Sequence, residues 1–210
     1  MTDPAPAPVP GGQLPEWLRP FAVVAGLVAV MWVVEAVDLL PGTDLDRWGI
    51  RPRTLVGLRG VVLSPFLHGG IGHLVSNTIP FLVLGWLIAA SGTVRYLEVT
   101  AIVGLTSGLG VWLLSPSQSV TIGASGLVFG YLTYLLARAI FEIKIAYLLG
   151  GLVVLFLYGG VLWGLLPRPG ISWQGHLFGA LGGVAAARFL HKPGERTLPD
   201  DRDPRAPNLP

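Results

Sequence analysis

The feature that most restricts the fold of this chain is an uncharged stretch at its centre. No residue from Val99 to Ala137 carries a charged side chain. A helix that crosses a bilayer needs about 20 mainly apolar residues, so this stretch is too long for one helix. The segment Ser115–Gly123 contains Ser, Pro and Gly and has the composition of a turn. We therefore interpret the stretch as two membrane-spanning helices joined by a loop.

Other apolar runs of similar length lie on both sides of this stretch. A long polar segment rich in Pro and Gly, from Asp38 to Gly72, separates the first run from the rest and is expected to form an outer loop. The sequence thus predicts an all-α, polytopic membrane protein with a six-transmembrane-helix bundle. The predicted helices are Trp17–Val37, His73–Ser91, Tyr96–Leu114, Ala124–Phe141, Ile145–Leu166 and Trp173–Leu190.

These helices are expected to form one membrane domain, residues 17–190. Residues 1–16 are rich in Pro and Gly, and residues 191–210 are polar and rich in Pro. Both segments are predicted to be disordered tails. The first tail is not a signal peptide, because no basic start is followed at once by an apolar run.

Composition agrees with a membrane bundle and excludes other classes of protein. Hydrophobic residues make up 52% of the chain and charged residues only 12%, so disorder of the whole chain is excluded. Fourteen Lys and Arg against twelve Asp and Glu leave no basic patch for nucleic acid. The 29 glycines suit close helix packing in a membrane. Without cysteine, neither a disulfide framework nor thiol chemistry is possible.

The distribution of Lys and Arg predicts the orientation, since cytoplasmic loops carry an excess of them. If both termini are cytoplasmic, nine basic residues lie inside and five outside. We therefore expect a multi-pass protein of the cell membrane with both termini in the cytoplasm. The inside set is Arg19, Arg95, Arg138, Lys144, Arg188, Lys192, Arg196, Arg202 and Arg205, and the outside set is Arg47, Arg51, Arg53, Arg59 and Arg168.

Polar side chains at membrane depth are costly, and each one is a candidate for function. His73 and Asn77 lie four residues apart, on one face at the start of a predicted helix, and His68 precedes them. Both side chains of this pair are able to donate hydrogen bonds into the bundle. The alternative interpretation is structural, because His and Asn often join transmembrane helices by hydrogen bonds.

A serine follows the central loop in the sequence Gly123-Ala-Ser125-Gly126. Ser125 lies near a helix N-terminus, where free N–H groups and the helix dipole favour negative charge. Such donors stabilise the oxyanion of a tetrahedral intermediate. The alternative is plain packing, since Gly, Ala and Ser are common at contacts between membrane helices.

His176 is the only ionisable residue between Arg168 and Arg188, and Gly175, Gly179 and Gly183 flank it at helical spacing. This row of glycines suits close packing against the helix that carries Gly126 and Gly130. Such packing brings His176 within reach of Ser125, where a neutral imidazole acts as general base. The alternative is a buried histidine bonded to a carbonyl group.

The three clusters agree in depth. With both termini inside, the helices that carry His73, Ser125 and His176 all begin at the outer side of the membrane. Each of the three residues lies near that beginning. Residues that merely join helices have no reason to agree in depth, so together they predict a serine nucleophile, a histidine base and oxyanion donors.

The three motifs together resemble the rhomboid family of intramembrane serine proteases, over roughly Leu55 to Arg188. The resemblance implies a Ser–His dyad that hydrolyses peptide bonds in or near transmembrane segments of other membrane proteins, in a cavity open to the outer side. It implies no cofactor and no metal. Its site residues would be Ser125 as nucleophile, His176 as base, His73 and Asn77 with the backbone N–H of Ser125 as oxyanion hole, and His68, Gly123, Gly126 and Phe129 in support.

Two positions depart from the pattern of the family. Leu58-Arg59 stands where many members have Trp-Arg, and Phe129 stands where some members have a Tyr stacked on the base. Phe129 is able to stack but not to hydrogen-bond. Glu35, near the outer end of the first helix, is interpreted as an interfacial residue rather than a partner of the first loop.

Two other functions are compatible with this sequence. A relative without protease activity would bind transmembrane clients, although such relatives typically lose the serine or the base, and both are present here. A small transporter would show paired intramembrane charges or inverted repeats, and we detect neither in the last five predicted helices.

Overall fold

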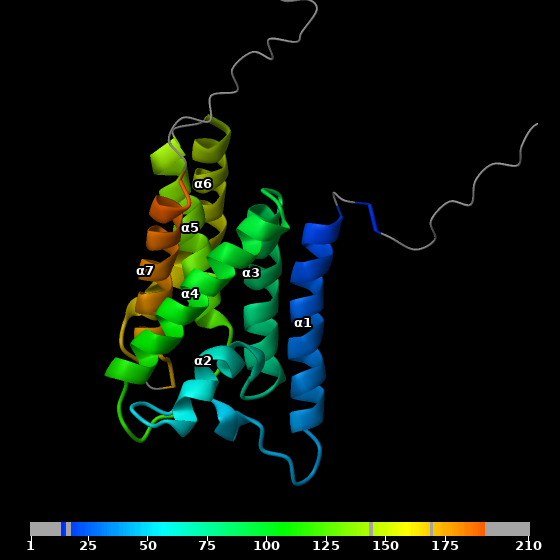
Figure 1. The fold of residues 1–210 in the computed structure, drawn as a ribbon, viewed down its shortest axis with the longest axis vertical. Coiled ribbons are helices and arrows are strands. Elements are labelled where there is room, and N and C mark those ends of the chain that lie inside the picture. The colour runs from blue at the N-terminus through cyan, green and yellow to red at the C-terminus, as the bar shows by residue number, and fades with distance from the viewer. Residues whose placement is uncertain (1–13, 16–17, 143–144, 169, 192–210) are drawn as a thin grey trace, which may run out of the picture.

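The computed structural model describes residues 14–15, 18–142, 145–168 and 170–191, with the side chains of 145–148 left undescribed. Trp17, Lys144 and most of both predicted tails lie outside these ranges. Within them the chain is all helical, with seven α-helices, four short 3-10 helices and no strand. The α-helices are α1 (Arg19–Asp38), α2 (Gly60–Leu63), α3 (Ile71–Ala89), α4 (Thr93–Leu114), α5 (Ser125–Glu142), α6 (Ile145–Tyr158) and α7 (Trp173–Phe189), as Figure 1 shows.

The longer helices begin and end close to their predicted bounds, with one exception. The predicted helix Ile145–Leu166 is wrong over its last part, because α6 ends at Tyr158 and the chain continues as the 3-10 helix η4, Gly159–Leu165. Two successive glycines, Gly159 and Gly160, stand at the change. Glycine has low helix propensity, and 3-10 turns with i→i+3 hydrogen bonds are frequent at the ends of α-helices.

Three helices of the described residues are long and apolar enough to cross a membrane by themselves: α1, α3 and α4. A shorter apolar segment runs through α6 and η4, from Leu149 to Leu165. The helix α7 has 17 residues. The structure therefore gives an all-helical membrane protein with three candidate spans.

The closest helix packing joins α5 and α7, as the glycine rows predict. A Cβ added to Gly179 would overlap the backbone carbonyl of Gly126, and one added to Gly183 would overlap that of Gly130. The two backbones therefore touch, which only glycine permits. This contact brings the first turn of α7 beside the first turn of α5.

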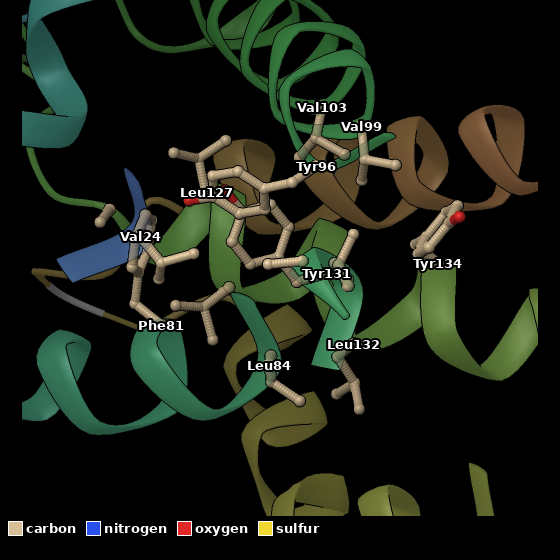
Figure 2. Close-up of a cluster of buried hydrophobic side chains, with 14 of the residues drawn as sticks. Val24, Phe81, Leu84, Tyr96, Val99, Val103, Leu127, Tyr131, Leu132 and Tyr134 are labelled. Carbon is tan, nitrogen blue, oxygen red and sulfur yellow. Dashed lines mark hydrogen bonds between the residues drawn. The ribbon is translucent and has the colours of Figure 1, made fainter. Parts of the chain in front are cut away.

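The core lies between α1, α3, α4 and α5, where Val24, Phe81, Tyr96 and Tyr131 are fully buried (Figure 2). The hydroxyl of Tyr131 lies 2.8 Å from Thr100 Oγ1 and 3.2 Å from the Tyr96 hydroxyl. Buried polar groups are costly unless they are hydrogen-bonded, and this small network satisfies two tyrosines at once. These hydrogen bonds join α4 to α5.

The loop from α1 to α3 is folded into short helices: η1 (Asp46–Trp48), η2 (Val56–Arg59), α2 and η3 (Ser64–Phe66). Two backbone hydrogen bonds between Ile50 and Thr121, 2.9 and 3.0 Å long, join it to the loop that precedes α5. Arg53 donates to the carbonyl oxygens of Leu113 and Ser115 at the end of α4, both at 2.8 Å. The loop from α1 to α3 is thus fixed to the segment that carries the serine.

The interfacial position expected for Glu35 is wrong. Its side chain is only 1% exposed, and the backbone N–H of Gly70 donates a hydrogen bond to it. Gly70 is the N-cap of α3, where no side chain of the turn itself caps the helix. The first N–H groups of a helix need acceptors, and Glu35 on α1 supplies one. Arg59, for which sequence gave no role, lies over the ring of Trp48 at 5.1 Å.

Candidate active site

Ser125 and His176 form a hydrogen-bonded pair. Ser125 is the first residue of α5, and His176 lies in the first turn of α7. Nε2 of His176 is 2.8 Å from Oγ of Ser125. The glycine contact between α5 and α7 explains why two residues 51 positions apart meet.

The second ring nitrogen of His176 also has a hydrogen-bond partner. Nδ1 lies 2.8 Å from the backbone carbonyl oxygen of Gly164, in η4. A carbonyl oxygen only accepts hydrogen bonds, so Nδ1 carries the proton in the neutral ring. Nε2 is then the free acceptor that faces Ser125. This is the tautomer that a general base for a serine hydroxyl needs.

The ring of Phe129 fixes the plane of the His176 imidazole. The two rings are stacked, with centroids 4.1 Å apart and planes inclined by 8°. Phe129 lies one helical turn after Ser125 on α5. The histidine is therefore oriented by three contacts: a ring on one face, a carbonyl group at Nδ1 and the serine at Nε2.

The turn before α5 depends on Gly123. Its φ of +106° lies in a region that residues with a Cβ rarely adopt. Its N–H donates to the carbonyl oxygen of Ser64 in η3, at 2.8 Å. A Cβ here would lie 2.8 Å from both Cε1 and Nε2 of His73. Gly123 thus lets the chain turn into α5 while the imidazole of His73 packs against it.

His73 and Asn77 lie beside the serine turn, on α3. The Gly69 N–H donates to Nδ1 of His73 at 3.3 Å, which leaves the proton of a neutral ring on Nε2, the atom that faces Gly123. Nδ2 of Asn77 lies 3.7 Å from the position of a Cβ on Gly123 and donates to the His73 carbonyl at 3.1 Å. Both side chains therefore present N–H groups near Ser125.

His68 lies behind this pair and not at the dyad. Its ring is 1% exposed and meets the ring of His73 edge to face, with centroids 5.1 Å apart. Burial, and to a lesser degree the nearby His73, lower the pKa of His68 to about 4. It is therefore neutral at physiological pH. A backbone hydrogen bond with Phe66 opposes this lowering in part.

Gly126 is required for packing. A Cβ at this position would overlap Oγ of Ser107 on α4. Ser107 in turn donates to the backbone carbonyl oxygen of Gly175, next to His176, at 2.8 Å. Three helices thus meet around the dyad, and the small residue makes room for the hydrogen bond that ties α4 to α7.

Ser125 and His176 open into a cavity of about 930 Å³, and His73 and Asn77 form part of its wall. The other residues of the wall come mainly from the loop before α5 and from the segment between η4 and α7. A cavity of this size accommodates a short extended peptide as well as water. No group of three or more His, Asp or Glu side chains in the described ranges is arranged to hold a metal ion.

Sequence reasoning missed the contact from Gly164. Every residue has a backbone carbonyl, so no side-chain pattern marks the one that holds His176. It also missed Ser115 and Ser172, which belong to the cavity wall and whose hydroxyl oxygens are buried without a partner in the described part of the chain. Isolated serines in loops gave no signal.

Comparison with known proteins gives the following matches. A family model described as Rhomboid domain matches residues 57–193. An uncharacterized protein of Mycobacterium tuberculosis is 45% identical over 188 residues, which cover 85% of this chain and 78% of that protein. An uncharacterized protein of Mycobacterium leprae is 41% identical over 190 residues, covering 86% and 75%. A Bacillus subtilis protein named "Putative rhomboid protease YdcA" is 27% identical over 191 residues, covering 86% and 94%.

Proposed function

The chain belongs to the rhomboid family, and from that premise we propose that it is an intramembrane serine protease. Its substrates would be membrane proteins, cleaved within or near a transmembrane segment. The observation that carries the proposal is the position of His176, whose Nε2 lies 2.8 Å from Ser125 Oγ while Gly164 holds Nδ1. A buried histidine with a merely structural role needs no serine at its second nitrogen.

In the proposed mechanism, Ser125 Oγ attacks the carbonyl carbon of the scissile bond while Nε2 of His176 takes its proton. The imidazolium that forms donates one N–H to the Gly164 carbonyl and the other toward the leaving amine. When the C–N bond breaks, that second proton passes to the amine. Water then attacks the acyl-enzyme, with His176 again as base, and releases the acid product and free Ser125.

Three groups are proposed to stabilise the oxyanion of each tetrahedral intermediate. They are the Nε2–H of His73, the Nδ2–H of Asn77 and the backbone N–H of Ser125 at the start of α5. Donors held in place before the reaction stabilise developing charge without reorganising. The hydrogen bonds that hold His73 and Asn77, from Gly69 and to the His73 carbonyl, support this assignment.

The apolar helices and the family make this a membrane protein, and we propose six spans for it. Besides α1, α3 and α4, these would be α5, the continuous segment α6–η4, and α7. Residues 17–190 would form the membrane domain, residues 1–16 and 191–210 would be tails, and both termini would lie in the cytoplasm at the plasma membrane. The cavity would then face the outer side, where peptide-bond hydrolysis finds its water.

The test is cleavage of a single-pass model substrate by the full chain in liposomes. The wild type should cleave it, and Ser125→Ala and His176→Ala should not, although both variants should keep the thermal unfolding midpoint of the wild type within a few degrees. Undiminished cleavage by Ser125→Ala would refute the proposal. A fluorophosphonate probe should label the wild type and not Ser125→Ala, whereas a protein that only binds clients would stay unlabelled.

A further inference from the structure

The cavity wall carries one kind of charge. Of the described residues that line it, Arg168 is the only one with a permanent charge, and none is a carboxylate. The Arg168 side chain is exposed and makes no ion pair or hydrogen bond with the described part of the chain. It stands in the segment between η4 and α7, on the same wall as His176. A cation without a partner at the rim of a peptide-sized cavity is available to a ligand.

Helix termini add to this positive field. The helices α3, α5 and α7 all begin at the cavity, and none has an acidic residue in its first turn. The N-caps of α3 and α7 give no side-chain hydrogen bond to their helices. The N-termini of α5 and α7 therefore contribute partial positive charge at the cavity, whereas the Gly70 N–H at the start of α3 already donates to Glu35.

Buried hydroxyl groups point to a polar occupant. Ser115, at the end of α4, is 3% exposed and belongs to the cavity wall, and its buried Oγ has no partner among the described residues. The Oγ of Ser172, the N-cap of α7, is also buried without a partner among the described residues. A buried hydroxyl left unpaired costs free energy, and a bound polar group repays that cost. A hydroxyl group both donates and accepts hydrogen bonds, so these serines suit a polar group of either sign, and Arg168 sets the preference for an acidic one.

Two carboxyl groups, those of Glu35 and Asp46, lie near the start of α3 but are not part of the cavity wall. Asp46 lies behind Gly69, where a Cβ on the glycine would be 3.9 Å from Asp46 Oδ2. Burial, and then the charges of Asp38, Glu35 and Asp44, raise the pKa of Asp46 to about 6, so that its negative charge is lost as the pH falls through that value. It is also not part of the cavity wall.

We infer that the cavity selects substrates with an acidic residue close to the scissile bond, and that Arg168 is the specificity-determining residue that pairs with it. This inference rests on the proposed function. The same field disfavours a basic residue at that place, because like charges repel. Arg168 acts on binding of the substrate and takes no part in bond cleavage.

The experiment uses single-pass substrates in liposomes that differ at one residue. Asp, Asn or Lys is placed in turn at each position within four residues of the scissile bond, and kcat/KM is measured with the full chain. At one or two positions the wild type should prefer Asp to Lys by about tenfold or more, mainly through KM. High salt should reduce this preference, since it screens exposed charges.

Variants of Arg168 separate charge from structure. Arg168→Gln should lose the preference, Arg168→Glu should reverse it, and Arg168→Lys should keep it. Arg51→Gln, a change of an exposed arginine outside the cavity wall, should behave as the wild type. Equal kcat/KM for Asp and Lys at every position, or a preference unchanged in Arg168→Glu, overturns the inference while cleavage itself upholds the proposed function. If no substrate is cleaved at all, the proposed function fails and this inference with it.

Discussion

Phe129 and His176 lie face to face, with ring centroids 4.1 Å apart and planes inclined by only 8°. The stack restricts rotation of the imidazole, which must keep Nε2 on Ser125. We predict that Phe129→Ala lowers kcat by about 10- to 100-fold, because small displacements of reacting groups have effects of that order. KM should change little. Phe129→Tyr keeps the ring and should retain most of the activity, and equal losses in both variants would contradict an orienting role for the stack.

Gly164 allows a second test of how the base is held. A Cβ at this position would lie 2.9 Å from Cζ of Phe129 and 3.1 Å from Nδ1 of His176, so Gly164→Ala must push η4 away from the histidine. We predict a loss in kcat of about tenfold or more, since a hydrogen bond to a charged group is worth roughly 1.5–3 kcal/mol. Nitrogen NMR of labelled histidine should show less of the Nδ1–H tautomer.

Gly160→Ala is the matched control for this change. It makes the same substitution in the same 3-10 helix, but a Cβ there would meet nothing within 4 Å. It should leave kcat and the histidine tautomer as in the wild type. If Gly160→Ala and Gly164→Ala lower kcat equally, the cause is a general disturbance of η4 and not the carbonyl contact.

The contacts of His176 with Phe129 and with the Gly164 carbonyl show what can and cannot be predicted from sequence. The glycine spacing and the depth of Ser125 and His176 predicted that they meet, and the resemblance to the family predicted that Phe129 stacks on His176. The tautomer of His176 was not predictable, because it depends on a backbone carbonyl from η4. That carbonyl lies in the segment that was predicted to continue the helix to Leu166 but forms a 3-10 helix after Tyr158.

Glu35 shows a second limit of sequence reasoning. A carboxylate near the end of an apolar helix usually lies at the membrane interface, and that prior favoured the wrong interpretation. The true partner, the N–H of Gly70, belongs to a turn 35 positions away, and only the packing of α1 against α3 brings it near. By contrast, the helix bounds and the contact of α5 with α7 follow from local hydropathy and glycine spacing, which sequence records directly.

The oxyanion assignment predicts the effects of changes at His73 and Asn77. Asn77→Ala and His73→Ala should each lower kcat by about 100-fold or more with little change in KM, as for removal of one oxyanion donor. His68→Ala should have a smaller effect, since His68 contacts the site only through the ring of His73. The measurement is steady-state cleavage in liposomes. A change confined to KM would assign Asn77 to substrate binding instead.

The contact between α5 and α7 predicts a large effect of one methyl group. In Gly179→Ala the new Cβ would overlap the Gly126 carbonyl, so α7 must move away from α5. Overpacking costs about 1–3 kcal/mol, and the same movement separates His176 from Ser125. Both the unfolding midpoint in detergent and kcat should therefore fall. Gly26→Ala on α1, where a Cβ meets nothing within 4 Å, is the control and should change neither.

Asp46, in the loop between α1 and α3, predicts a dependence of stability on pH. Burial, and after it the charges of Asp38, Glu35 and Asp44, raise the pKa of Asp46 from 3.8 to about 6 in the folded protein. A raised carboxyl pKa means that the folded state holds the proton more tightly than the unfolded state. The contribution of this group to stability is therefore fully present below pH 3.8 and is lost as the pH rises through 6.

We accordingly expect Asp46→Asn to raise the unfolding midpoint at pH 7.5, by a few degrees, and to change it little at pH 4. The amide keeps the shape of the side chain and removes the charge that burial disfavours. The difference between variant and wild type should be measured at each pH, because His68, whose pKa burial lowers to about 4, affects both proteins alike and in the opposite sense. A difference that is constant from pH 4 to 7.5 would show that folding does not raise the pKa of Asp46.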